Sequence, residues 1–147
     1  MPINKLDNIL IVVNNLEIVK KFFVGLGYSL EGESKISGPL VGKLIGLDNV
    51  ESTIVMLRGP DGSGIELDKF HVPAQENDKL KSLPVTELGY RRIMLSVSDI
   101  DAMIQIACSN GASLMGEMNY ENIYKLAYVC GPEGIIVAFA EKLKSKI

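Results

Sequence analysis

The chain alternates between short apolar runs and a segment whose apolar residues recur every three or four positions. Residues 6–13 are aliphatic apart from Asp7 and Asn8, which predicts a buried strand. Residues 16–26 then predict an amphipathic helix. The apolar face of this helix consists of Leu16, Val19, Phe22, Phe23 and Leu26. Asn14 and Asn15 are suited to cap its start, and Gly27 is suited to cap its end.

Three further strands are predicted in the first half, because β-rich runs occupy residues 28–33, 51–57 and 63–70. Residues 34–49 are rich in glycine, contain a proline and have no clean period, so they predict a loop. A Gly-Pro-Asp-Gly turn at residues 59–62 connects the last two strands. The first half therefore reads as β-α-β-β-β.

The second half repeats this order. A strand at residues 90–97 is followed by a Ser98-Asp99 cap and by a helical apolar face that ends near Gly111. The remaining strands are expected at residues 113–118, 123–130 and 134–141. We expect a first module at residues 1–72, a linker at 73–88 with one helical turn around 77–81, and a second module at 89–147, all within one structural domain.

Two offsets relate the halves. The turn at residues 59–62 recurs as Gly-Pro-Glu-Gly 72 positions later, whereas Gly27 and Gly111 lie 84 positions apart, as do Asn8 and Arg92. The first half therefore carries a 12-residue insertion, which falls in the glycine-rich segment. Such internal repetition indicates a duplicated fold.

Composition limits the classes of function. The chain has 147 residues, 47% of them hydrophobic and 22% charged, which is typical of a globular domain. The net charge of −3 and the absence of a basic cluster before the tail at 142–146 argue against nucleic acid. We find no signal sequence and no apolar run long enough for a membrane span, so a cytoplasmic location is expected. Cys108 and Cys130, in apolar contexts, predict buried free thiols, with a disulfide left open.

This pattern resembles the vicinal-oxygen-chelate superfamily, which includes glyoxalase I, methylmalonyl-CoA epimerase, extradiol dioxygenases and the bleomycin and fosfomycin resistance proteins. The resemblance is carried by residues 6–13 with Leu16, 59–62, 65–67, 97–101, 111–112 and 131–137. It implies an α+β fold of two tandem βαβββ modules. Their strands would form a cupped, mostly antiparallel, eight-stranded half-barrel around a small-molecule site. It also implies a homodimer.

Strand alternation predicts which side chains line the cup. On the strand at 63–70, Ile65 and Leu67 point toward a helix, whereas Glu66 and Asp68 point into the cup. The other predicted cup residues are Leu6, Asn8, Leu10, Ile54, Met56, Arg58, Tyr90, Arg92, Met94, Tyr124, Leu126, Tyr128, Ile136, Ala138 and Ala140. For the third strand of each half, at residues 51–57 and 123–130, the choice of face assumes that the helices cover Val55, Leu57, Ala127 and Val129.

In metal-using members of the superfamily, the ligands come from the first and fourth strands of each module. The matching positions here are Asn8, Glu66, Arg92 and Ala138, and only Glu66 matches the ligand pattern. Arginine is a permanent cation and alanine has no donor atom, so we expect neither a metal site nor another cofactor. A buried carboxylate needs a partner, which Arg92 or Arg58 would provide.

Three functions follow from the resemblance and these residues. The first is a metal-independent lyase or isomerase-type enzyme acting on a small anionic carbonyl or carboxylate compound. Arg92 would anchor the substrate, Glu66 would move a proton, and Tyr124 or Tyr128 would donate to a developing oxyanion. Additional substrate contacts are expected from Asn8, Arg58 and His71.

The second function is a non-catalytic small-molecule binding protein, like the drug-sequestering members. The third is a metal enzyme with rearranged ligands such as Glu66 and His71. For each of these functional hypotheses, the same residues also allow a purely structural interpretation. Glu66 and Arg92 would form an ion pair in a disused site, the tyrosines would only pack, and His71 would lie on a surface loop.

Overall fold

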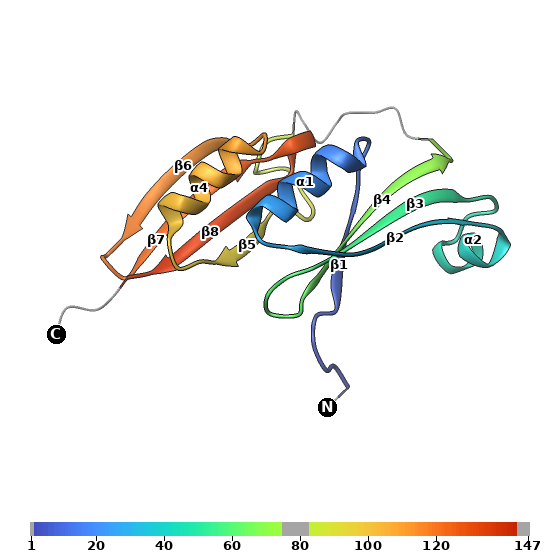
Figure 1. The fold of residues 1–147 in the computed structure, drawn as a ribbon, viewed down its shortest axis with the longest axis horizontal. Coiled ribbons are helices and arrows are strands. Elements are labelled where there is room, and N and C mark those ends of the chain that lie inside the picture. The colour runs from blue at the N-terminus through green and yellow to red at the C-terminus, as the bar shows by residue number, and fades with distance from the viewer. Residues whose placement is uncertain (1, 75–82, 144–147) are drawn as a thin grey trace. The chain divides into compact units, whose positions relative to one another are not determined.

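The computed structural model describes residues 2–74 and 83–143. The chain divides into two compact units, Met1–Asn77 and Asp78–Ile147. Each unit contains a four-stranded sheet with a helix after its first strand, which confirms the α+β fold of tandem βαβββ modules (Figure 1). The single domain expected from the two modules stays a prediction.

The first unit has the strand order β1-β4-β3-β2, in which β1 runs parallel to β4 and the other neighbours are antiparallel. Its elements are β1 (Asn8–Val12), α1 (Leu16–Leu26), β2 (Ser29–Ser37), α2 (Pro39–Ile45), β3 (Glu51–Arg58) and β4 (Gly64–Val72). The fourth strand of the module, β4, is therefore an inner strand of the sheet, and its side chains lie between those of β1 and β3.

The second unit has the equivalent order β5-β8-β7-β6. Its elements are β5 (Ile93–Ser96), α4 (Ile100–Ser109), β6 (Ser113–Tyr120), β7 (Tyr124–Cys130), a 3₁₀ turn (Pro132–Gly134) and β8 (Ile136–Lys142). In the described ranges no helix is both long and apolar enough to cross a membrane.

Helix α1 forms as the sequence predicts. The side chain of Asn15 accepts a hydrogen bond from the backbone N–H of Ile18 at 3.1 Å, and Gly27 ends the helix with a φ of 121°. The helix packs on β3 and β4. Its buried residues and the facing strand residues are Val19, Phe22, Phe23, Leu26, Val55, Leu57, Ile65 and Leu67. The predicted phase of β3 and β4 is therefore confirmed.

The second unit buries its core in the same way. Asp99 caps α4 by accepting a hydrogen bond from Ala102 N at 3.1 Å. The Ile100 N–H donates to Oε1 of Glu141 at 2.7 Å, which ties the start of the helix to β8. The helix packs on β7 and β8, where the buried residues of the facing side are Ala127, Val129, Val137 and Phe139. Ile136 and Ala138, on the other side of β8, are buried too. The predicted phase of β7 is confirmed as well.

The strand registers confirm the internal repeat. Leu10 lies opposite Glu66 in the first sheet, and Met94 lies opposite Ala138 in the second. These pairs are related by the two offsets deduced from the sequence. A β-bulge near the start of β2 also recurs at the matching place in β6. The modules therefore share their register as well as their order of elements.

The prediction of a loop at residues 34–49 is wrong. Strand β2 continues to Ser37, and the insertion forms the short helix α2. Pro39 is compatible with the first helical turn, and Gly46 ends the helix in the left-handed region with a φ of 77°. A helix of seven residues is too short to show a clear apolar period, so the glycines of this segment favoured the prediction of a loop. The helical turn expected around 77–81 lies outside the described residues.

Three smaller expectations also need correction. Leu6 and Tyr90, expected in the cup, precede β1 and β5 and are exposed. Both cysteines are free thiols, as predicted, but Cys108 is exposed and Cys130 is only half-buried. Cys108 lies near the end of α4, where the apolar sequence context does not ensure burial.

Gly64 is required by the close approach of β1 to β4. A Cβ atom at this position would lie 3.0 Å from both Asn8 Cβ and Asp7 O. We expect Gly64→Ala to lower the free energy of unfolding by about 1–3 kcal/mol, measured by urea denaturation. Gly32→Ala is the matched control, because nothing lies within 4 Å of a Cβ there. Equal stability of the two variants would contradict this interpretation.

Candidate functional site

The face of the first sheet that lies away from α1, which we call the distal face, carries three of the predicted site residues of this unit, Asn8, Arg58 and Glu66. The strand register arranges its side chains in rows across β3, β4 and β1. These rows are Arg58–Gly64–Asn8, Met56–Glu66–Leu10 and Ile54–Asp68–Val12. Glu66 and Asp68 are therefore consecutive residues of one face, each between apolar neighbours.

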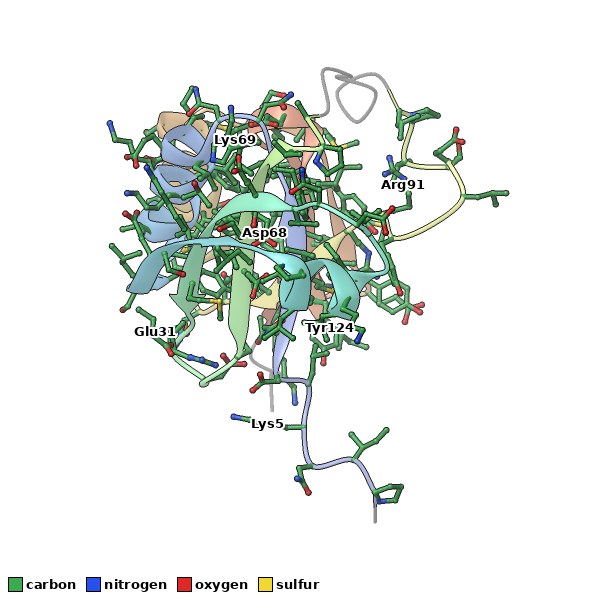
Figure 2. All side chains as sticks on the ribbon, turned by 90° about the vertical axis from the view of Figure 1, so that its right-hand side faces the viewer. Lys5, Glu31, Asp68, Lys69, Arg91 and Tyr124 are labelled. Atoms are coloured by element: carbon green, nitrogen blue, oxygen red, sulfur yellow. The ribbon has the colours of Figure 1, made fainter. Side chains whose placement is uncertain are left out.

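Asp68 is the more deeply buried of these two acids. Only 5% of its surface is exposed, and within the described residues its Oδ1 atom has no hydrogen-bond partner. Burial raises the pKa of Asp68 to about 7, and the neighbouring Glu66 carboxyl adds to this shift through a hydrogen bond and charge repulsion. Its neighbour in sequence, Lys69, instead uses its Nζ atom to donate to Asn14 O at 2.6 Å (Figure 2).

A carboxyl group with a pKa of about 7 exchanges its proton readily at neutral pH. A hydrogen bond between two carboxyl groups requires a proton on one of them, and the raised pKa of Asp68 places that proton on Asp68 below about pH 7. Such a pair is suited to acid–base chemistry on a bound molecule.

Asn8 lies on the distal face at the edge of the sheet, one row away from Glu66. Its Nδ2 atom donates to Oδ2 of Asp7 at 3.3 Å, and both side chains are exposed. Asn8 therefore shares a face of the sheet with Glu66, and its role in binding stays a prediction.

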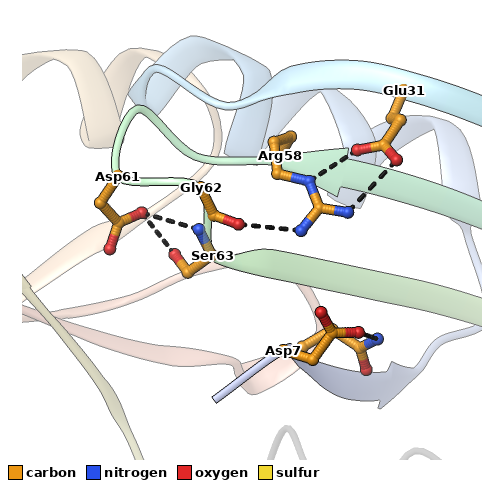
Figure 3. A network of polar contacts seen from close by, with 7 residues as sticks. Asp7, Glu31, Arg58, Asp61, Gly62 and Ser63 are labelled. Atoms are coloured by element: carbon orange, nitrogen blue, oxygen red, sulfur yellow. Dashed lines mark hydrogen bonds and ion pairs between the residues drawn. The ribbon is translucent and has the colours of Figure 1, made fainter. Parts of the chain in front are cut away.

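Arg58 is held by a structural network (Figure 3). Its Nε and Nη2 atoms donate to the two carboxylate oxygens of Glu31 at 2.6 and 3.2 Å, and its Nη1 atom donates to Gly62 O at 2.8 Å. The bond with Arg58 holds the pKa of Glu31 below its usual range. In the same turn, Asp61 Oδ1 accepts bonds from the N–H and hydroxyl of Ser63. Arg58 therefore pairs with Glu31 and is not the counter-charge of Glu66.

His71 is not brought together with Glu66. Its Nε2 atom lies 2.7 Å from Oγ1 of Thr53, and both residues alternate with the side chains of the distal face. His71 is exposed and lies near the end of β4, where a bulge interrupts the register with β3. The ligand pair of Glu66 and His71, considered for a rearranged metal site, is not assembled in this unit.

In the second unit, the matching face brings Arg92 and Tyr128 together. The guanidinium carbon of Arg92 lies 5.7 Å from the centroid of the Tyr128 ring, a cation–π contact. Tyr128 lies in one row with Ala138 and Met94. The pairing of Arg92 with Glu66 would join the two units, and it stays a prediction.

Tyr124 lies at the other end of β7. Its neighbours in the sheet are Tyr120 and Lys142, and its side chain is exposed. Tyr124 and Tyr128 share a face but lie about 13 Å apart along the strand, at roughly 3.3 Å per residue. A ligand of a few atoms contacts one of these hydroxyl groups and not both.

The four positions that match the ligands of metal-using relatives do not fit a divalent ion. Ala138 has no donor atom, and Arg92 is a cation in contact with an aromatic ring. The amide of Asn8 is a weak ligand for transition metals. Among these four positions only Glu66 provides a carboxylate, which is too few ligands for a divalent ion. The mechanism proposed below therefore uses no metal ion.

Two residues were missed or undervalued in the sequence. Asp68 was expected on the correct face but was given no role, although two carboxylates spaced by two in an apolar strand are a usable signal. Ser52 gives no signal in the sequence, since a serine near the start of a strand has no distinctive pattern. Its side chain is buried, and its Oγ atom has no partner within the described residues.

Comparison with solved structures gives close matches. A glyoxalase family protein from Bacillus cereus has 42% sequence identity and a TM-score of 0.88, over 98% of this chain and 99% of the other. A glyoxalase family protein from Enterococcus faecalis has 17% identity and a TM-score of 0.68, over 96% of this chain and 100% of the other.

The fosfomycin resistance protein FosX from Listeria monocytogenes, solved with Mn(II) and sulfate, has 13% identity and a TM-score of 0.62. That match covers 95% of this chain and 93% of FosX. No protein-family model and no curated protein matches the chain. The two matches under 20% identity support the fold alone, whereas the Bacillus cereus protein also supports the family.

Proposed function

The chain belongs to the glyoxalase family of the vicinal-oxygen-chelate superfamily, and on this premise we propose that it is a metal-independent enzyme of the lyase or isomerase type. Its substrate is a small anionic carbonyl or carboxylate compound. The observation that carries this proposal is the carboxyl pair of Glu66 and Asp68 on the distal face of the first sheet.

The reaction begins with the transfer of a proton. Glu66 removes a proton from the carbon next to a carbonyl group, and the electron pair of the broken C–H bond forms a carbon–carbon double bond. The electron pair of the carbonyl π bond moves to its oxygen, which becomes an enolate oxygen. Return of the proton to another position completes an isomerisation, and loss of a leaving group from the adjacent carbon completes an elimination.

The other residues bind and orient the substrate. Arg92 binds the carboxylate, because guanidinium groups form paired hydrogen bonds with carboxylates. Tyr128 or Tyr124 donates a hydrogen bond to the enolate oxygen. Asn8 is a further binding residue in this proposal. The homodimer and the cytoplasmic location stay predictions based on the resemblance and the sequence.

One observation favours binding without catalysis as the second candidate. In the second sheet, the row that matches Glu66 consists of Met94, Ala138 and Tyr128, with no acid. An aromatic and apolar surface of this kind binds a small molecule without chemistry.

A solvent-exchange screen separates these candidates. The purified protein, with and without a chelator, is incubated in D₂O with pyruvate, hydroxypyruvate, oxaloacetate and methylmalonate, and deuterium uptake is followed by ¹H NMR. We expect exchange at the acidic carbon at least about 100-fold faster than in buffer, unchanged by the chelator. Ligand-induced shifts without any exchange would favour the binding protein. Exchange that the chelator abolishes would contradict the metal-independent mechanism.

A further inference from the structure

Two buried polar side chains of the first unit each have an oxygen atom that no described protein group hydrogen-bonds. Ser52 is 1% exposed and Asp68 is 5% exposed. Within the part of the chain that the structure describes, neither Ser52 Oγ nor Asp68 Oδ1 forms a hydrogen bond. Buried polar groups are rarely left unsatisfied, and each such group in a native protein calls for an explanation.

The strand register brings these two atoms to the same face. Ser52 lies opposite Phe70, and Ile54 lies opposite Asp68, so Ser52 and Asp68 are diagonal neighbours on β3 and β4. Diagonal neighbours of this kind have their Cα atoms roughly 7–8 Å apart, with the Cβ atoms somewhat closer. One group located between the two side chains is within reach of both.

The chemistry of the two atoms selects the group. The Ser52 hydroxyl donates one hydrogen bond and accepts others, and the Asp68 carboxylate accepts. A group that satisfies both must accept from the serine and donate to the acid, and a hydroxyl group does this with a single oxygen. A carboxylate satisfies only the serine, and an ammonium group cannot accept from it.

We propose that Ser52 and Asp68 form a subsite for a hydroxyl group of the ligand, beside Glu66 on the distal face. The ligand is then a hydroxylated carbonyl or carboxylate compound. This inference rests on the proposed function, because it places the hydroxyl within two residues along β4 of the group that moves the proton. A bound water molecule has the same donor and acceptor chemistry, and the experiment below distinguishes the two.

The test compares ligands that differ by one hydroxyl group. Hydroxypyruvate and pyruvate form one pair, and glycolate and acetate form the other. Their dissociation constants are measured with the full chain by ¹H–¹⁵N NMR titration. We expect the hydroxylated member of at least one pair to bind at least about 10-fold more tightly, since a buried polar site rejects a ligand that cannot satisfy it. No preference in either pair, including no binding at all, would overturn the proposal.

Variants then assign the preference to the subsite. Ser52→Ala is expected to reduce it to less than about 2-fold, with pyruvate or acetate affinity unchanged, because only the contact with the hydroxyl is lost. Asp68→Ala is expected to reduce the preference to the same extent. Asp68→Asn keeps an acceptor oxygen and is expected to retain part of the preference. Ser34→Ala and Asp48→Asn are the controls, because they remove similar groups at exposed positions. If Asp68→Ala does not fold, Ser52→Ala decides, and a full preference in that variant overturns the proposal.

Crystal structures with and without hydroxypyruvate distinguish the ligand from water. A ligand oxygen between Ser52 and Asp68 supports the subsite, whereas a water molecule that stays there in the complex contradicts it. The solvent-exchange screen remains independent. If the protein prefers hydroxylated ligands but does not catalyse solvent exchange, the proposed reaction is wrong and the hydroxyl subsite is supported. If it catalyses exchange but shows no such preference, the subsite is wrong and the proposed reaction is supported.

Discussion

Glu66→Gln is expected to lower the rate of solvent exchange by at least about 100-fold, because glutamine has nearly the same shape as glutamate but cannot accept a proton. Glu66 lies between Met56 and Leu10 on the distal face, so the substitution leaves the neighbouring packing intact. Ligand binding, measured by NMR titration, is expected to change far less than the exchange rate. A loss of rate without a loss of binding is the signature of a catalytic base.

Glu51→Gln is the matched control for this experiment. Glu51 is an exposed carboxylate at the start of β3, so its substitution makes the same change of charge in the same sheet. Its exchange rate is expected to equal that of the wild type. An unchanged rate in Glu66→Gln would refute the assignment of Glu66 as the base, and an equal loss in both variants would indicate a general effect of charge.

Asp68→Asn is expected to change how stability depends on pH. The pKa of Asp68 is raised from 3.8 to about 7 in the folded protein, chiefly by burial, so the folded state binds this proton more tightly than the unfolded state. The stability from this proton is fully present below about pH 4 and is lost as the pH rises through 7. Asparagine has no such proton. The stability of the variant relative to the wild type is therefore expected to rise between pH 4 and pH 8.

The size of this effect is a few kcal/mol, since one pKa unit corresponds to about 1.4 kcal/mol. Urea denaturation of both proteins at pH 4.5, 6 and 8 measures it, and the difference between the proteins cancels most groups that titrate alike in both. Glu66 is the acid that faces Asp68 on β4, whereas Ile54 and Val12 face it from β3 and β1. A difference in stability that stays constant across this range would show that Asp68 is ionised at all these pH values in the folded protein.

The sequence predicted much of the fold because the relevant signals are local. The amphipathic helix at Leu16–Leu26, the cap at Asn15 and the alternation of Ile65 and Leu67 depend on residues within a few positions of one another. The helix α2 escaped prediction because its seven residues cannot display a period. The repeat was found from glycine-containing turns whose backbone constraints are visible in sequence.

The candidate site was only partly predictable, since long-range contacts decide what each side chain does. From the sequence, Arg58 was equally suited to bind a substrate, to pair with Glu66 or to face solvent. The pairing of β2 with β3 places it beside Glu31, 27 positions away in the sequence, and the two side chains form a hydrogen bond. His71 was considered either as a substrate contact or as part of a surface loop, and the end of β4 brings it to Thr53. A titratable residue therefore cannot be assigned a partner until the strand register is known.

The order of elements, the duplication and the face on which Glu66 and Asp68 lie were determined by the sequence itself, because backbone periodicity fixes the direction of neighbouring side chains. The tertiary structure decided that Asp68 is buried with a raised pKa, and that the neighbouring Ser52 hydroxyl has no hydrogen-bond partner among the described residues. Burial and pairing arise when strands distant in the chain come together, and a linear pattern contains no measure of the water that such packing removes.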